Sequence, residues 1–215
     1  MTSSSRILCA LAIVLSACAK PAPEPAAPPV PARPLAALTS QQVVVVPTQT
    51  LRETDALGWT QQVPRSRELL RALDDSIRAE LAARGIDKQW VFADALERAS
   101  KLNPSYAVDP YTLDARGLTS PSVVVGTPIT GNLATQLRTL IALQESARAV
   151  LVPSELRFDR LPSGEGVAVL HVVLADARMR DIRWIGDVRS DPSPTFSRGL
   201  LSSLAAHFAD LITAP

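Results

Sequence analysis

The sequence predicts a single α/β domain with a mixed parallel and antiparallel sheet of about four to six strands and helices packed on it. Three features of the chain support this fold class. The β-branched run 42–46 has the composition of a strand buried on both faces. Amphipathic segments with helical periodicity separate the apolar runs that follow it. The last apolar runs come one after another with only short turns between them, as antiparallel neighbours do.

A leader precedes the domain. Residues 1–17 have the organisation of a secretory signal peptide, with Arg6 before the apolar run 7–15 and small residues after it. That run is too short to span a bilayer as a mature helix. The tetrapeptide LSAC at 15–18 resembles the lipobox of bacterial lipoproteins, which implies cleavage before Cys18 and acylation of its thiol and amine. The alternative is an ordinary secreted protein with a cysteine near its cleavage site.

Acylation at Cys18 would place the protein on a membrane. Two or more acyl chains anchor stably, because each buried CH2 contributes about 0.8 kcal/mol. The residue after the cysteine is Ala19, not the Asp that tends to retain enteric lipoproteins in the inner membrane. The resemblance therefore implies the periplasmic face of the outer membrane. With Cys9 removed in the leader, no thiol is left for a disulfide, metal site or nucleophile.

Residues 18–40 form the expected lipid anchor and tether, and residues 41–215 the single periplasmic domain. The segment 19–37 is rich in alanine and proline, so it cannot build a core and favours extended polyproline II structure. At about 3.1 Å per residue, it could hold the domain up to roughly 60 Å from the membrane. A ligand for a proline-binding groove is the alternative. The net charge of +1 gives no electrostatic case for nucleic acid.

The first half of the domain begins with the strand 42–46, ended by Pro47. A helix over 66–84 follows, with Ser66 as its expected N-cap and Gly85 at its C′ position. A short strand (89–92), a helix opened by a capping box (94–97), an irregular insert (104–131) with a strand at 122–126, and a helix (132–149) complete this half.

The second half is expected to hold three strands and a closing helix. They cover the ranges 150–158, 166–175, 182–189 and 195–212. In the middle strand, the period of two places Val169, His171 and Val173 on one face and Leu170, Val172 and Leu174 on the other. Both sets are mainly apolar, so we expect helices on both sides of the sheet.

The pair of segments 173–178 (VLADAR) and 182–188 (IRWIGDV) resembles a hairpin that recurs in periplasmic lipoproteins. Families with this hairpin include the curli-secretion lipoprotein, the activator lipoproteins of penicillin-binding proteins, and the N-terminal domain of the Tol-system translocation protein. The resemblance implies a periplasmic binding or scaffolding role and carries no active site across. It departs in the insert 104–131. We expect Trp184 of this hairpin in the core and Gly186 where a side chain would clash.

No catalytic constellation is apparent in the sequence, so we do not expect an enzyme, a metal site or a cofactor. The glycine spacing of 126–131 lacks the lysine and Ser/Thr of a phosphate-binding loop. His171 and His207 have no clustered metal or catalytic partners in sequence and are expected to be structural. Asp74 and Asp75 occupy successive helical positions that point in different directions, and are interpreted as solvated surface.

Two hypotheses for function follow. The first is a noncatalytic membrane-anchored lipoprotein that binds an envelope protein, with Trp59, Tyr106 and Tyr111 as candidate contact residues. For Trp59, packing against its own domain is the alternative. The second hypothesis is an envelope enzyme or small-ligand sensor that uses the insert 104–131 as a pocket lid, with Tyr106, Asp109 and Tyr111 as polar contributors.

Overall fold

The computed structural model describes residues 33–63, 65–86, 88–106, 108–144 and 147–214. A six-stranded sheet has the order β3-β1-β4-β5-β6, and β2 pairs with β4 beside that path. The strands are β1 (Val43–Val45), β2 (Thr50–Leu51), β3 (Trp90–Val91), β4 (Ala149–Arg160), β5 (Gly166–Asp176) and β6 (Asp181–Arg189). The α-helices are α1 (Ser66–Ala83), α2 (Ala93–Leu102), α3 (Gly131–Ala142) and α4 (Gly199–Asp210). The expected α/β fold class is confirmed.

Strand pairing divides the sheet into two parts. The short strand β1 pairs in parallel with both β3 and β4, so it lies between two strands that both come later in the chain. The long strands β4, β5 and β6 form an antiparallel meander. This mixture follows from the connections, because helices join the parallel strands and tight turns join the antiparallel ones. The strand β2 was not expected from the sequence.

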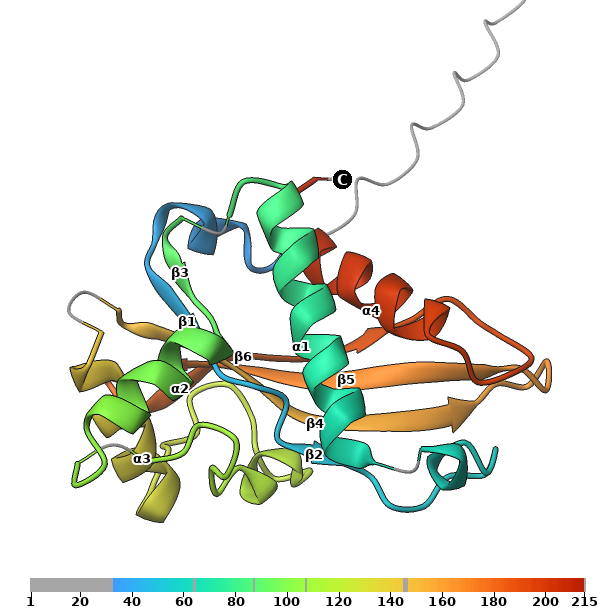
Figure 1. Cartoon of the computed structure of the whole chain (residues 1–215), viewed down its shortest axis with the longest axis horizontal. Coiled ribbons are helices and arrows are strands. Elements are labelled where there is room, and N and C mark those ends of the chain that lie inside the picture. The colour runs from blue at the N-terminus through green and yellow to red at the C-terminus, as the bar shows by residue number, and fades with distance from the viewer. Residues whose placement is uncertain (1–32, 64, 87, 107, 145–146, 215) are drawn as a thin grey trace, which may run out of the picture. The chain divides into compact units, whose positions relative to one another are not determined.

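Helices cover both faces of the sheet, as expected. The helices α1 and α4 lie side by side on one face of the sheet (Figure 1). Leu73 of α1 and Phe208 of α4 belong to the same hydrophobic core as Leu170 and Val172 of β5. The helices α2 and α3 belong to a second core, which includes Val173 of β5. The alternation predicted for β5 is therefore confirmed. On the second face the cover is incomplete, since His171 is partly exposed.

The end of α1 agrees with the sequence, and its beginning does not. Gly85 has a φ of +76° and donates to the carbonyl of Ala82 at 2.9 Å, while Ile86 donates to Leu81 at 2.9 Å. These bonds form the Schellman motif expected of a C′ glycine. Ser66, the expected N-cap, is instead the first helical residue, with no side-chain cap at the preceding position.

Three further expectations about local structure were wrong. The capping box at 94–97 does not form, because α2 begins at Ala93 and ion pairs with two arginines hold the Asp94 carboxylate. The segment 122–126 is a turn rather than a strand, and Gly126 donates to the carbonyl of Ile182 at the edge of β6. The helix expected over 132–149 ends at Ala142.

The packed domain begins before residue 41. A 3₁₀ helix spans Ala36–Ser40, and the flanking Leu35 and the internal Leu38 are buried. The amide of Leu35 also donates to the carbonyl of Leu211 at 3.0 Å, which ties this segment to the end of the closing helix. Residues 35–40, which were expected to belong to the tether, are therefore part of the packed domain. Cys18 and the rest of the leader lie outside the described residues.

The insert 104–131 is a packed part of the domain. Its apolar residues Leu113, Leu118 and Ile129 are buried in the second core beneath α2 and α3. A short 3₁₀ helix at Arg116–Thr119 lies within it. Among the helices of the described residues, none is long and apolar enough to cross a membrane.

Candidate functional site

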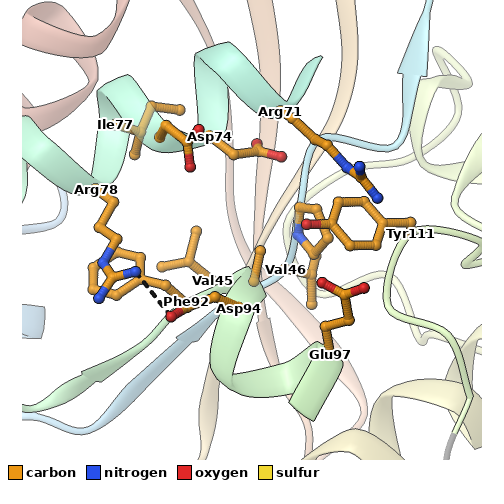
Figure 2. A pocket seen from close by; sticks show the side chains of 13 residues that line it. Val45, Val46, Arg71, Asp74, Ile77, Arg78, Phe92, Asp94, Glu97 and Tyr111 are labelled. Atoms are coloured by element: carbon orange, nitrogen blue, oxygen red, sulfur yellow. Dashed lines mark ion pairs between the residues drawn. The ribbon is translucent and has the colours of Figure 1, made fainter. Parts of the chain in front are cut away.

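A cleft of about 210 Å³ opens at the carboxyl ends of the parallel strands β1 and β3, between α1 and α2. We call it the α1–α2 cleft (Figure 2). In α/β sheets such crevices, where the strand order reverses, commonly hold ligands. Its lining residues are Val45, Val46, Pro47, Arg71, Asp74, Asp75, Ile77, Arg78, Phe92, Ala93, Asp94, Glu97 and Tyr111.

Asp74 is the least satisfied polar group of this cleft. Its Oδ1 accepts hydrogen bonds from the amide of Thr48 at 2.9 Å and from the Thr48 hydroxyl at 2.7 Å. Its Oδ2 is shielded from solvent and has no hydrogen-bond partner among the described residues. Burial, partly offset by the bonds from Thr48, raises the pKa of Asp74 to about 7. The carboxyl group is therefore poised between its two protonation states near neutral pH.

Two arginines of α1 lie one turn to either side of Asp74, and both have other partners. The Arg78 guanidinium lies 2.9 Å from the carboxylate of Asp94 and 5.7 Å from the Phe92 ring centre. The Arg71 guanidinium lies 5.0 Å from the ring centre of Tyr111. The contacts of Arg78 join α1 to α2 and to the residue just before it, and the contact of Arg71 joins α1 to the insert (Figure 2).

Electrostatics set the protonation of the other groups in the cleft. Burial would raise the pKa of Asp94, but the charges and hydrogen bonds of Arg78 and Arg98 hold it below its usual range. Burial, followed by the nearby charge of Asp74, raises the pKa of Tyr111. Asp94 is thus a charged partner of arginine, and Tyr111 a neutral phenol, at neutral pH.

A second polar cluster lies on the partly uncovered face of the long strands. The carboxylate of Asp187 lies 2.6 Å from the Arg157 guanidinium and 2.8 Å from Nδ1 of His171. The carboxylate of Glu155 lies 2.6 Å from the Arg52 guanidinium. Burial opposes ionisation of Asp187, but the hydrogen bonds from Arg157 and His171 keep its pKa below the usual range. The arginines here already have carboxylate partners, and the buried polar atom without a hydrogen-bond partner in this cluster is His171 Nε2.

The structure separates the three contact candidates of the sequence. Trp59 is only 4% exposed, and its ring packs 5.6 Å from Phe158 and 6.1 Å from Phe196. It is thus a core residue, and its interpretation as a partner contact is corrected. Tyr106 is 62% exposed and lies outside the cleft. Tyr111 is the candidate that lines the cleft.

The other insert residue proposed as a polar contributor, Asp109, serves the backbone. Its carboxylate accepts the amide of Tyr111 at 3.0 Å, which shapes the turn that carries the tyrosine. Trp184 was expected in the core and is only partly buried on β6. A Cβ at Gly186 would overlap its indole ring, so the predicted clash at that glycine is confirmed.

The interpretation of Asp74 as solvated surface was wrong, whereas Asp75 is exposed as expected. A signal for the difference existed in the sequence. Asp74 lies four residues after Leu70 and three before Ile77, which places it at the border of the buried stripe of α1. In the described residues no group of three or more His, Cys, Asp or Glu side chains could hold a metal ion.

Comparisons with known proteins give structural similarities alone. No family model matches the chain, and no curated protein does. The solved structures similar to it include the following three. A PelC dodecamer from Paraburkholderia phytofirmans is 16% identical, covering 82% of this chain and 91% of the other, with a TM-score of 0.38. LpoB from Escherichia coli is 13% identical, with coverages of 89% and 88% and a TM-score of 0.36. Lipoprotein GNA1162 from Neisseria meningitidis is 19% identical, with coverages of 78% and 93% and a TM-score of 0.38.

Proposed function

We propose that this chain is a lipid-anchored protein of the cell envelope whose domain binds a partner protein without catalysing a reaction. The LSAC tetrapeptide at 15–18 carries this proposal, since it follows a short apolar leader and precedes a proline-rich tether. Cys18 carries the lipid, and the periplasmic face of the outer membrane is the proposed location. The domain acts in envelope assembly or transport.

The anchor is tested by labelling cells with radioactive palmitate. Wild-type protein incorporates the label and sediments with membranes, and Cys18→Ala yields an unlabelled precursor or a soluble form. Cys9→Ala is the matched control, because that cysteine lies within the leader and its replacement leaves acylation intact. Equal labelling of wild type and Cys18→Ala would remove the basis of the proposal.

The binding role is tested by crosslinking in intact cells followed by purification of the processed protein. A stoichiometric envelope protein recovered with it supports a binding domain. Turnover of a surveyed substrate by the purified protein would contradict the noncatalytic role.

A small-ligand sensor is the second candidate, because Tyr111 of the insert lines the α1–α2 cleft beside Arg71. Small-molecule sites usually enclose about 300–1,000 Å³. The cleft, at about 210 Å³, is smaller than this range. Its size is therefore better suited to one side chain of a protein than to a whole metabolite.

A further inference from the structure

We propose that the α1–α2 cleft receives one basic side chain, an arginine or lysine, from the partner protein, with Asp74 as its counter-charge. This inference rests on the proposed function, because it supposes a protein partner. It adds the chemistry that the partner must present and the place where the partner binds.

The first support is an unmet hydrogen bond. Oδ2 of Asp74 has no partner among the described residues, although Asp74 lines the cleft. The side chain is held at Oδ1 by Thr48, so it keeps its place at the cleft wall. Because rotation about χ2 of an aspartate is soft, a small turn of the carboxylate presents Oδ2 to a donor in the cleft. Guanidinium and ammonium groups are donors only.

The second support is the balance of charge. Four carboxylates and two guanidinium groups line the cleft. Arg78 is held by Asp94 at 2.9 Å, and Arg71 is held over the ring of Tyr111. Asp94 also pairs with Arg98 at 3.1 Å, and Glu97 pairs with Lys101 at 2.9 Å, so both carboxylates of α2 have cations of their own. Asp74 has no ion pair among the described residues. A cation supplied by a partner would pair with ionised Asp74, while an anion would be repelled by it.

The third support is the shape of the lining. The apolar side chains of Val45, Val46 and Ile77 lie beside Asp74, and Phe92 and Tyr111 provide aromatic groups at the sides (Figure 2). A lysine or arginine buries its aliphatic stem against such apolar surface while its charged end reaches a carboxylate. A volume of about 210 Å³ leaves room for one such side chain.

Ionisation of Asp74 couples this binding to pH. Asp74 has a pKa of about 7, so roughly a tenth of it is ionised at pH 6 and nine tenths at pH 8. If only the ionised form is competent, the apparent dissociation constant falls about tenfold between these two pH values. An anionic ligand would show the opposite trend, because it would bind better to the protonated carboxyl. The charged groups that face Asp74 are Asp75, Arg71 and Arg78 of α1, Asp94 and Glu97 of α2, and Tyr111 of the insert.

The test uses the processed full-length protein, purified in detergent, and the blocked tripeptide acetyl-Gly-Arg-Gly-amide. Its matched control is the same tripeptide with citrulline, which keeps the shape of arginine and removes its charge. Nuclear magnetic resonance titration follows the ring signals of Tyr111 and Phe92. We expect the arginine peptide to shift these signals, with affinity about tenfold higher at pH 8 than at pH 6. We expect the citrulline peptide to bind far more weakly at both.

Two variants complete the experiment. Asp74→Asn keeps an oxygen for the bonds from Thr48 and is expected to abolish the pH dependence and to weaken arginine binding at pH 8 at least tenfold. Glu68→Gln, which removes an exposed carboxylate of α1 outside the cleft, is expected to change binding little. Equal binding of the two peptides, affinity that falls as pH rises, or an unchanged Asp74→Asn variant would each overturn the inference. Since the titration uses purified protein, its failure leaves the palmitate result untouched, and the two proposals fail separately.

Discussion

The replacement of Asp74 by asparagine should stabilise the protein at alkaline pH. Burial raises the pKa of Asp74 from 3.8 to about 7, so the folded protein binds more protons than the unfolded chain between these values. The free energy of unfolding therefore falls as pH rises through this window. The whole difference corresponds to about 4 kcal/mol, at 1.36 kcal/mol for each pKa unit. Above pH 7 the wild-type protein bears nearly all of that cost.

Asp74→Asn has no charge to bury and still offers Oδ1 to Thr48. Its amide group leaves donors unsatisfied, which costs about 1–3 kcal/mol at every pH. The stability of the variant relative to wild type should thus rise by about 2–3 kcal/mol between pH 5 and pH 8. Urea denaturation at both pH values measures this, as a relative midpoint shift of about 1 M. Glu68→Gln, at an exposed position of α1, should show no such change. The same pH profile for wild type and Asp74→Asn would refute the reasoning.

Three further predictions concern packing. Trp59→Ala should lower the free energy of unfolding by about 3–5 kcal/mol, which is more than Trp184→Ala should, because Trp59 is buried and Trp184 is only partly buried. Chemical denaturation of both variants measures the two losses, and the reverse order would contradict the prediction. Gly166→Ala should destabilise more than Gly186→Ala, because its methyl group would overlap the buried Trp59 and Leu57, whereas Gly186 faces the less buried Trp184; their melting midpoints compare the two. Removing residues 19–32 after the lipidated cysteine should leave the melting midpoint unchanged, and removing 19–38 should lower it by several degrees, since Leu35 and Leu38 are buried.

The sequence predicted the elements whose signal is local. Residues 43–46 are all valine, and β1 is buried on both faces. The end of α1 depends on Gly85, whose φ of +76° few other residues adopt readily. Helix beginnings were less predictable. The side chains of Ser66 and Asp94 are both able to cap a helix, but neither does so, and the Asp94 carboxylate forms ion pairs instead. Capping competes with such contacts at similar energies.

The burial of Trp59 and of Trp184 was predicted wrongly, because it depends on tertiary contacts that a local sequence pattern does not contain. Trp59 lies in a polar loop without periodicity, and its partners Phe158 and Phe196 come from β4 and the segment before α4. The contacts among these three rings depend on the tertiary fold, so no local pattern near Trp59 predicts them. Trp184 lies on β6, the last strand of the sheet, where fewer neighbours cover a side chain. An apolar strand pattern alone does not distinguish such an edge from the centre.

The cost of Asp74 bears on why a carboxyl group occupies this position. A domain typically has about 5–15 kcal/mol of net stability, so a burden of about 4 kcal/mol at neutral pH is large. An unpaired buried group of this kind is more expected at a functional site than in a structural core. A partner cation that neutralises Asp74 would bind the folded state alone and stabilise it by linkage. The arginine tripeptide should therefore raise the melting midpoint more at pH 8 than at pH 6, and should have no such effect on Asp74→Asn. If the peptide stabilised the wild type and the variant equally, Asp74 would destabilise the folded protein without taking part in binding.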